Sequence, residues 1–146
     1  MAKFAKGHFT PKNSAKYVGN GNPIYRSSWE LTFMNFCDLN ENILSWASEP
    51  LRIPYRNPFT GKMTTYVPDF LISYRHQDRT VKTELIEIKP KKQCVIEGKM
   101  STRNRAVVMI NHAKWAEARK FCQLQKIEFR IITEDDLYHM GGGRRK

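Results

Sequence analysis

Two acidic residues lie on neighbouring segments of the sequence where they could together bind a metal ion. Asp69 follows Pro68 at the start of one apolar run, and Glu87 lies near the end of the next, residues 81–89. The runs flank a polar stretch centred on Asp78, which predicts an antiparallel hairpin in which Asp69 faces Glu87. Directly opposed residues have Cβ atoms about 5 Å apart, and two carboxylates that close repel each other unless a cation lies between them. A divalent metal ion is the obvious cation.

The second run also places a lysine beside this pair. Because side chains alternate along a strand, Glu87 and Lys89 share one face with Leu85, and we expect this face to be polar and exposed. Ile86 and Ile88 point into the opposite, apolar layer. Phosphodiester hydrolysis uses this combination: oxygen ligands hold Mg²⁺, the metal polarises the phosphate and acidifies a water, and a nearby cation stabilises the developing charge. Lys89 could be that cation or could help to deprotonate the water, and the sequence leaves both roles open.

Simpler roles exist for the same residues. Glu87 and Lys89 could form a charge pair on an exposed sheet face, and Asp69 could be a turn residue at the entry of a strand. Glu30 stands three residues after a serine, the spacing of a helix capping box, which explains it without catalysis. A second Glu-x-Lys triplet, at residues 97–99, has no strand pattern around it, so context rather than the triplet singles out Glu87.

The composition is that of a basic globular protein. The 146 residues suffice for one domain with its own core, and the net charge of +11 indicates a polyanionic partner, with nucleic acid as the first candidate and a merely solvated basic surface as the alternative. Cys37, Cys94 and Cys122 are too widely spaced for a disulfide framework or a zinc site, and we interpret them as reduced, mostly buried thiols. No apolar run is long enough to span a membrane and residues 1–6 lack a secretory signal, so we expect a cytoplasmic protein without membrane contact.

A basic run follows Lys89 in the sequence. It suits the binding of DNA phosphates on either side of a cut, although a solvated loop is the alternative. Its candidate nucleic-acid-binding residues are Lys91, Lys92, Lys99, Arg103 and Arg105.

Hydrophobic periodicity predicts an α/β sandwich built on a mixed sheet. The expected helices are 28–39, 105–126 and a short one after Thr133; the expected strands are 43–48, 51–55, 63–74 with an interruption at Pro68, 81–89 as the central strand, and 129–132. Residues 27–140 would form the domain. Residues 1–26 would form a basic N-terminal arm that a partner orders, and residues 141–146 a basic C-terminal tail.

The motifs around the candidate site resemble those of the PD-(D/E)XK nuclease superfamily, which includes restriction endonucleases and the endonuclease subunit of Tn7-type transposition. Pro68-Asp69 followed by Glu87-Ile88-Lys89 carries this resemblance. Further segments make the sequence similar to the head completion nucleases of T4-like phages: YRSSWE at 25–30, WASE at 46–49, IPY at 53–55, IEIKPKK at 86–92 and FRIITED at 129–135.

The resemblance implies a restriction-endonuclease-like, three-layer sandwich around a mixed sheet. It implies that Asp69, Glu87 and the backbone carbonyl of Ile88 bind Mg²⁺, with Mn²⁺ as a substitute. Lys89 would assist the attacking water, and Glu30 would approach that water or a second metal ion.

The resemblance further implies a biological setting, the trimming or cutting of packaged phage DNA before a tail attaches to the head. The partners would be DNA and phage head or neck proteins, in the host cytoplasm during assembly and in the head–neck region of the virion. Two alternatives stay open: a non-catalytic head component or connector that grips DNA with a nuclease fold, and a restriction or transposition endonuclease subunit.

Overall fold

The computed structural model describes residues 6–139, so the expected C-terminal tail, 141–146, lies outside the described residues. The elements in chain order are β1 (Gly7–His8), η1 (Ser14–Lys16), β2 (Ile24–Tyr25), α1 (Ser28–Leu39), β3 (Ile43–Ser48), β4 (Ile53–Arg56), β5 (Met63–Tyr66), β6 (Phe70–Arg75), β7 (Val81–Ile88), η2 (Lys91–Gln93), α2 (Thr102–Gln125), β8 (Glu128–Ile132) and α3 (Glu134–His139).

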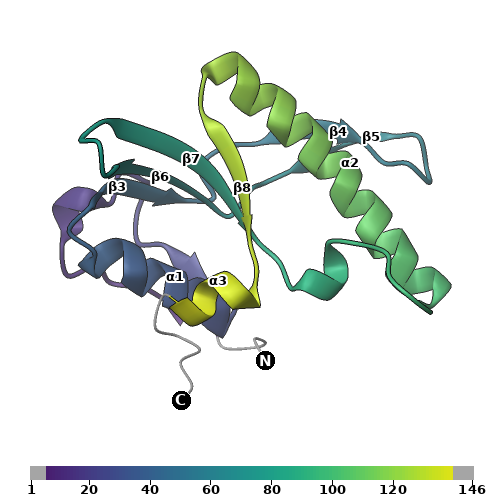
Figure 1. The fold of residues 1–146 in the computed structure, drawn as a ribbon, viewed down its shortest axis with the longest axis horizontal. Helices are drawn as coiled ribbons and strands as arrows, with labels where there is room; N and C mark the ends of the chain where they lie inside the picture. The colour runs from purple at the N-terminus through teal and green to yellow at the C-terminus, as the bar shows by residue number, and fades with distance from the viewer. Residues whose placement is uncertain (1–5, 140–146) are drawn as a thin grey trace.

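The main sheet is mixed, as the sequence predicts. Among residues 6–139 it has the strand order β3-β6-β7-β8, with β7 antiparallel to β6 and parallel to β8. The expected central strand is therefore β7. Helices α1 and α3 cover one face and α2 crosses the other (Figure 1), which gives the predicted three-layer α/β sandwich.

A separate apolar cluster fills the space on each face of the sheet. On the α1 side, Phe33 and Met34 pack against Phe70 and Ile86. On the other side, Leu85 of β7 packs with Trp115 of α2. Strand β7 thus carries apolar residues on both faces, the pattern of a strand buried between two helical layers.

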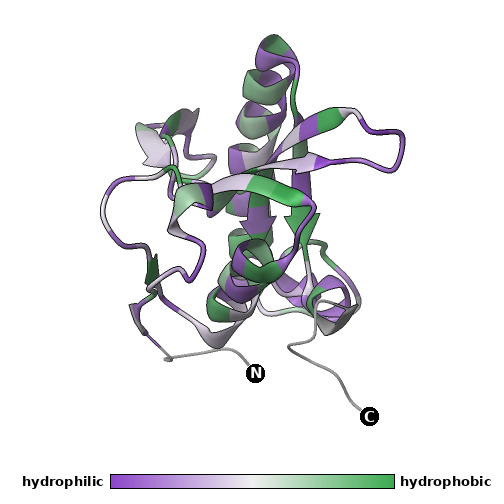
Figure 2. Ribbon diagram, turned by 90° about the vertical axis from the view of Figure 1, so that its left-hand side faces the viewer, coloured by the Kyte–Doolittle hydropathy of each residue, from purple (hydrophilic) through white to green (hydrophobic). Residues whose placement is uncertain are grey.

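Serine caps fix where the two long helices begin. The Ser27 hydroxyl accepts a hydrogen bond from the Glu30 amide at 3.1 Å, so α1 has the predicted bounds. The Ser101 hydroxyl accepts from the Asn104 amide at 3.0 Å, and α2 begins at Thr102, about one turn before the predicted start. Hydrophobic and hydrophilic segments alternate along α2 (Figure 2), as expected for a helix with one face on the sheet. No helix among the described residues is long and apolar enough to cross a membrane.

Strands β4 and β5 form a hairpin outside the main sheet. The sequence predicted one interrupted run over 63–74, but that run divides near Pro68: β5 pairs only with β4 among the described strands, whereas β6 enters the main sheet. The inward side chains of Ile53, Tyr55 and Tyr66 pack in the same cluster as Trp115 of α2.

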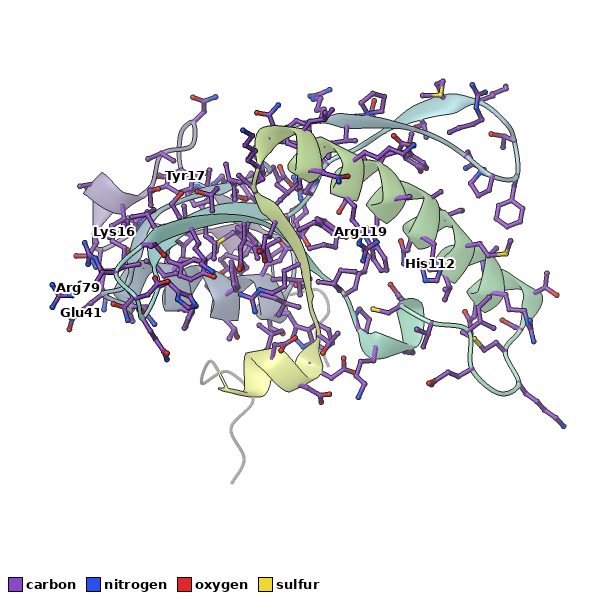
Figure 3. The ribbon with its side chains drawn as sticks, turned by 45° about the horizontal axis from the view of Figure 1, so that its top comes forward. Lys16, Tyr17, Glu41, Arg79, His112 and Arg119 are labelled. Atoms are coloured by element: carbon purple, nitrogen blue, oxygen red, sulfur yellow. The ribbon has the colours of Figure 1, made fainter. Side chains whose placement is uncertain are left out.

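The described part of the N-terminal segment, residues 6–26, packs against the domain. Phe9 is buried in the core, and Tyr17 lies edge-on to Trp46 with ring centroids 4.6 Å apart. Lys16 and Tyr17 lie beside the main sheet, far from His112 and Arg119 of α2 (Figure 3). These contacts differ from the expectation that a partner orders this segment, because Phe9 and Tyr17 provide apolar surface that the sheet itself buries.

Candidate active site

The register of β6 and β7 brings Asp69 to Glu87. The pairs run from Phe70↔Ile86 to Arg75↔Val81, which is the predicted hairpin register. Asp69 lies just before β6, where its amide donates to the Ile86 carbonyl at 3.1 Å. Its Oδ2 accepts from the Ile88 amide at 2.7 Å. Asp69 is therefore held against the β7 backbone on either side of Glu87, by its amide at Ile86 and by its carboxylate at Ile88.

Glu87 is buried rather than exposed. Its residue exposure is 3%, and Leu85 on the same face of β7 is fully buried. The expectation of an exposed polar face was wrong, because α2 covers this face and Trp115 packs in the cluster that contains Leu85. The Glu87 carboxylate keeps polar partners: Oε1 accepts from the Tyr66 hydroxyl at 2.7 Å, and Oε2 lies 3.5 Å from Lys89 Nζ.

Burial and mutual repulsion shift the titration of both carboxyl groups. Burial raises the pKa of Asp69 well above its usual range, and the nearby Glu87 charge raises it further, against the Ile88 amide and the Lys89 ammonium. Burial also raises the pKa of Glu87, against Lys89 and the Tyr66 hydroxyl. The two negative charges are thus incompletely compensated by the protein, an arrangement that favours a bound cation.

Glu30 combines a capping role with a place near this pair. Its amide donates to the Ser27 cap, and its Oε1 accepts from the Arg26 amide at 3.0 Å, one residue before the amide expected for a capping box. Burial raises the pKa of Glu30, and the charges of Glu49 and Glu87 add to this rise. Glu30 therefore takes part in the N-terminal cap of α1 and also lies close enough to Glu87 for their charges to interact.

A groove opens between the start of α1 and the end of β7. Its lining residues are Ser27, Trp29, Glu30, Ile88, Lys89, Pro90, Lys92 and Gln93. Glu30 and Lys89 thus face one shared space, which could admit a strand of a polyanion.

Two residues that sequence patterns did not single out complete the surroundings of Glu87. Tyr66 reaches it from the hairpin, as described. Lys114 reaches the same region from α2, with Nζ 5.7 Å from the Tyr66 ring centre and 5.9 Å from the Tyr55 ring centre. Burial lowers the pKa of Lys114 and Lys89 lowers it further, while the charges of Glu87 and Asp69 raise it.

The donor set fits a hard divalent cation. Asp69 and Glu87 offer carboxylate oxygens and Ile88 offers a backbone carbonyl, the ligand types that Mg²⁺ and Mn²⁺ prefer. Within residues 6–139 no group of three or more His, Cys, Asp or Glu side chains is arranged to hold a metal. Two carboxylates and a carbonyl would leave coordination positions for waters and a phosphate, as in catalytic rather than structural metal sites.

The predicted phosphate-binding residues do not all lie at the groove. Lys92 lines it, whereas Lys91 turns to α3 and pairs with Asp135 at 2.9 Å. Arg105, near the start of α2, donates from Nε to the Met100 carbonyl at 3.4 Å. Lys99 is exposed on the segment that leads into α2, and Arg103 is exposed in the first turn of α2.

Comparison with known proteins places the chain in a family. A family model described as "TnsA-like endonuclease N terminal" matches residues 40–134. This chain belongs to that family. The range matched by the TnsA-like model contains Asp69, Glu87, Lys89 and Lys114, and Glu30 precedes it.

A curated relative extends the similarity to nearly the whole TnsA-like chain. The "Head completion nuclease" of Enterobacteria phage T4 is 35% identical over 146 aligned residues, which cover 92% of this chain and 95% of the relative. The predicted relationship to head completion nucleases and to the Tn7-type endonuclease is thereby confirmed, and nuclease is the class of activity that the family supports.

Proposed function

We propose that this chain is a magnesium-dependent deoxyribonuclease that hydrolyses phosphodiester bonds at the site formed by Asp69, Glu87, Lys89 and Glu30. The observation that supports it most strongly is the position of Asp69, half-buried, beside the buried Glu87, with Lys89 Nζ 3.5 Å from a Glu87 oxygen. An acidic pair kept largely from solvent next to an ammonium group costs stability in a purely structural sheet, whereas metal-assisted phosphodiester hydrolysis uses it.

The residues have separate roles in this proposal. Asp69, Glu87 and the Ile88 carbonyl hold Mg²⁺, which would polarise the scissile phosphate and lower the pKa of a bound water. Lys89 donates to a phosphate oxygen and offsets the charge that develops on it. Glu30, whose pKa burial raises, faces the same groove and orients or deprotonates the attacking water.

Neighbouring residues keep the metal-binding carboxylates in place. The Ile88 amide fixes one oxygen of Asp69, and the Tyr66 hydroxyl fixes one oxygen of Glu87. Lys114 brings a positive charge toward the same pair from α2. Lys92 lines the groove, and with Lys99, Arg103 and Arg105 it would bind the DNA backbone beside the cut.

The similarity to the relative supports a proposal for the biological role. The T4 protein is named a head completion nuclease, and this chain covers 95% of its length. We therefore assign the chain to the trimming or cutting of packaged phage DNA before tail joining, in the host cytoplasm and at the head–neck region, in contact with head or neck proteins.

The test is a cleavage assay with the full chain. Circular, linear and single-stranded DNA are incubated with wild-type protein in Mg²⁺, in Mn²⁺ and in chelator, beside the Asp69→Asn and Lys89→Gln variants. Lys120→Gln is the matched control, because Lys120 lies on the outer part of α2 and pairs with Glu117 at 3.3 Å. We expect metal-dependent cutting by wild type and the control, and none by the two site variants.

The outcome separates the proposal from its rival. DNA binding without cleavage in either metal would contradict the proposal and favour a non-catalytic DNA-gripping head component. Cutting of circular DNA would indicate endonuclease action, whereas loss of linear DNA alone would indicate action from an end.

A further inference from the structure

The β4–β5 hairpin extends away from the candidate active site. It leaves the main sheet at the end where Asp69 lies and projects past α2, as seen in two views (Figures 1 and 3). Its base contacts the site directly, because Tyr66 at the end of β5 donates to Glu87. The hairpin tip is thus connected to the reacting centre by a short, regular strand.

Hydrogen bonds within the loop fix the shape of the tip. Asn57 Oδ1 accepts from the Phe59 amide at 2.8 Å and from the Thr60 amide at 3.1 Å. Arg56 Nη1 donates to the Gly61 carbonyl at 2.6 Å, and Gly61 adopts a φ of +73° that favours glycine. A loop ordered in this way loses little conformational entropy when it binds a ligand.

The tip presents apolar side chains in a basic setting. Phe59 is 55% exposed and Met63 is 57% exposed. Residues 50–68 contain no acidic residue and carry Arg52, Arg56 and Lys62. An exposed aromatic ring among cations fits a nucleic acid, because the ring can stack on a base while the cations contact phosphates.

We infer that the hairpin recognises the ends of DNA, with Phe59 stacking on the exposed face of a terminal or unpaired base. This inference rests on the proposed function and specifies the form of the substrate, a DNA molecule with a free end. The interior of a duplex offers no free base face unless stacking is broken at a cost of a few kcal/mol per step. A DNA end offers one without that cost.

The length of the hairpin predicts where the cut falls. Strand β5 covers three residue steps from Met63 to Tyr66, and a strand rises about 3.3 Å per residue, so the loop at the tip begins roughly 10 Å from the base of the hairpin. Base pairs along a duplex are about 3.4 Å apart. An end held by Phe59, which lies in this loop, would therefore place a phosphate at least about three base pairs inward at the metal-binding carboxylates.

The binding test needs no cleavage. In chelator, the full chain is titrated into a short blunt duplex with 2-aminopurine at its terminal base, into the same duplex with the probe at its centre, and into a closed dumbbell of the same sequence that has no ends. We expect the terminal probe to respond and the open duplex to bind about tenfold more tightly than the dumbbell. Phe59→Ala should remove both effects.

Two further variants distinguish the loss of stacking by Phe59 from the loss of any exposed apolar side chain or of a positive charge. Val81→Ala removes an equally exposed apolar side chain, 59% exposed, beside the β6–β7 turn. The β6–β7 turn, marked by Arg79, lies at the opposite end of the molecule from His112 of α2 (Figure 3). We therefore expect Val81→Ala to bind DNA like wild type. Lys62→Gln should reduce the salt dependence of binding by about one phosphate contact while the terminal probe still responds.

The binding results decide the inference independently of catalysis. If Phe59→Ala binds the open duplex and the dumbbell with unchanged affinities, the inference is overturned, even if the chain cuts DNA. If end binding depends on Phe59 but no metal supports cleavage, the inference stands and the proposed function fails. In active wild-type protein, cuts scattered without a preferred distance from the end would overturn the spacing argument.

Discussion

Replacing Asp69 by asparagine should stabilise the metal-free protein while abolishing its activity. The asparagine side chain keeps an oxygen that can accept the Ile88 hydrogen bond, but the substitution removes one of two adjacent negative charges. Burial and Glu87 raise the pKa of Asp69 in the folded state above its unfolded value, so the folded protein binds a proton more readily than the unfolded chain. Stability therefore falls as pH rises from the ordinary aspartate pKa through the raised one. At higher pH the full cost of the charge is present.

The size of the effect follows from the competing interactions. Two carboxylates about 5 Å apart repel by about 3 kcal/mol at an effective dielectric constant of about 20. The variant also loses the attraction of Asp69 to Lys89 and the stronger hydrogen bond of a charged acceptor, together about 2 kcal/mol. The net gain is about 1 kcal/mol, or a rise in Tm of about 2–4 °C for a chain of this size.

Mg²⁺ should make wild type more stable than Asp69→Asn, the reverse of their order in chelator. At a tenfold excess of Mg²⁺ over its dissociation constant, wild type gains about 1.4 kcal/mol, whereas Asp69→Asn has lost a ligand and gains little. Differential scanning calorimetry in chelator and in Mg²⁺, at neutral and acidic pH, measures both effects, with Glu117→Gln as a half-exposed acidic control on α2. A variant that melts several degrees below wild type in chelator would refute the reasoning, because Asp69 would then be stabilising without metal.

Three further substitutions test residues that the structure adds to the sequence-based picture. Tyr66→Phe removes the donor to Glu87, so we expect a loss of about 1–3 kcal/mol in thermal unfolding and about tenfold slower DNA cleavage. Lys114→Gln should slow cleavage at least tenfold, measured as kcat on linear DNA, because a cation near the acidic pair is lost, whereas Lys120→Gln should not change it. Phe9→Ala should lower the free energy of unfolding by about 3–5 kcal/mol and the calorimetric Tm by about 10 °C, because Phe9 is buried with its ring centroid 5.8 Å from that of Trp46. An unchanged Tm would mean that the segment 6–26 is a separable arm.

Local sequence patterns were sufficient to predict that Asp69 lies opposite Glu87. A polar turn around Asp78 and a strand period of two residues determine the pairing, and the observed register is the one that these two features predict. The bounds of α1 followed in the same way from the Ser27 cap. Such features involve residues close in sequence, so no knowledge of the packing is needed.

The environment of the site could not be predicted from the same patterns. A strand pattern tells which residues share a face but not which element covers it, so Glu87 was expected in solvent although α2 buries it. Tyr66 and Lys114 come from the hairpin and from α2, and no spacing in the sequence indicates that they meet. Phe9 likewise enters the core through packing, although the composition around it resembles that of a disordered arm.

Burial itself distinguishes the catalytic proposal from a structural one. A buried carboxylate pair costs stability, and apolar residues of similar volume would often make a more stable protein. Glu87 nevertheless lies beside fully buried Leu85, and three elements supply polar partners to it: the hairpin through Tyr66, β7 through Lys89 and α2 through Lys114. A protein that only grips DNA would gain nothing from keeping this charge out of solvent. A nuclease would gain, because electrostatic interactions with a metal ion and a phosphate are stronger where water is excluded.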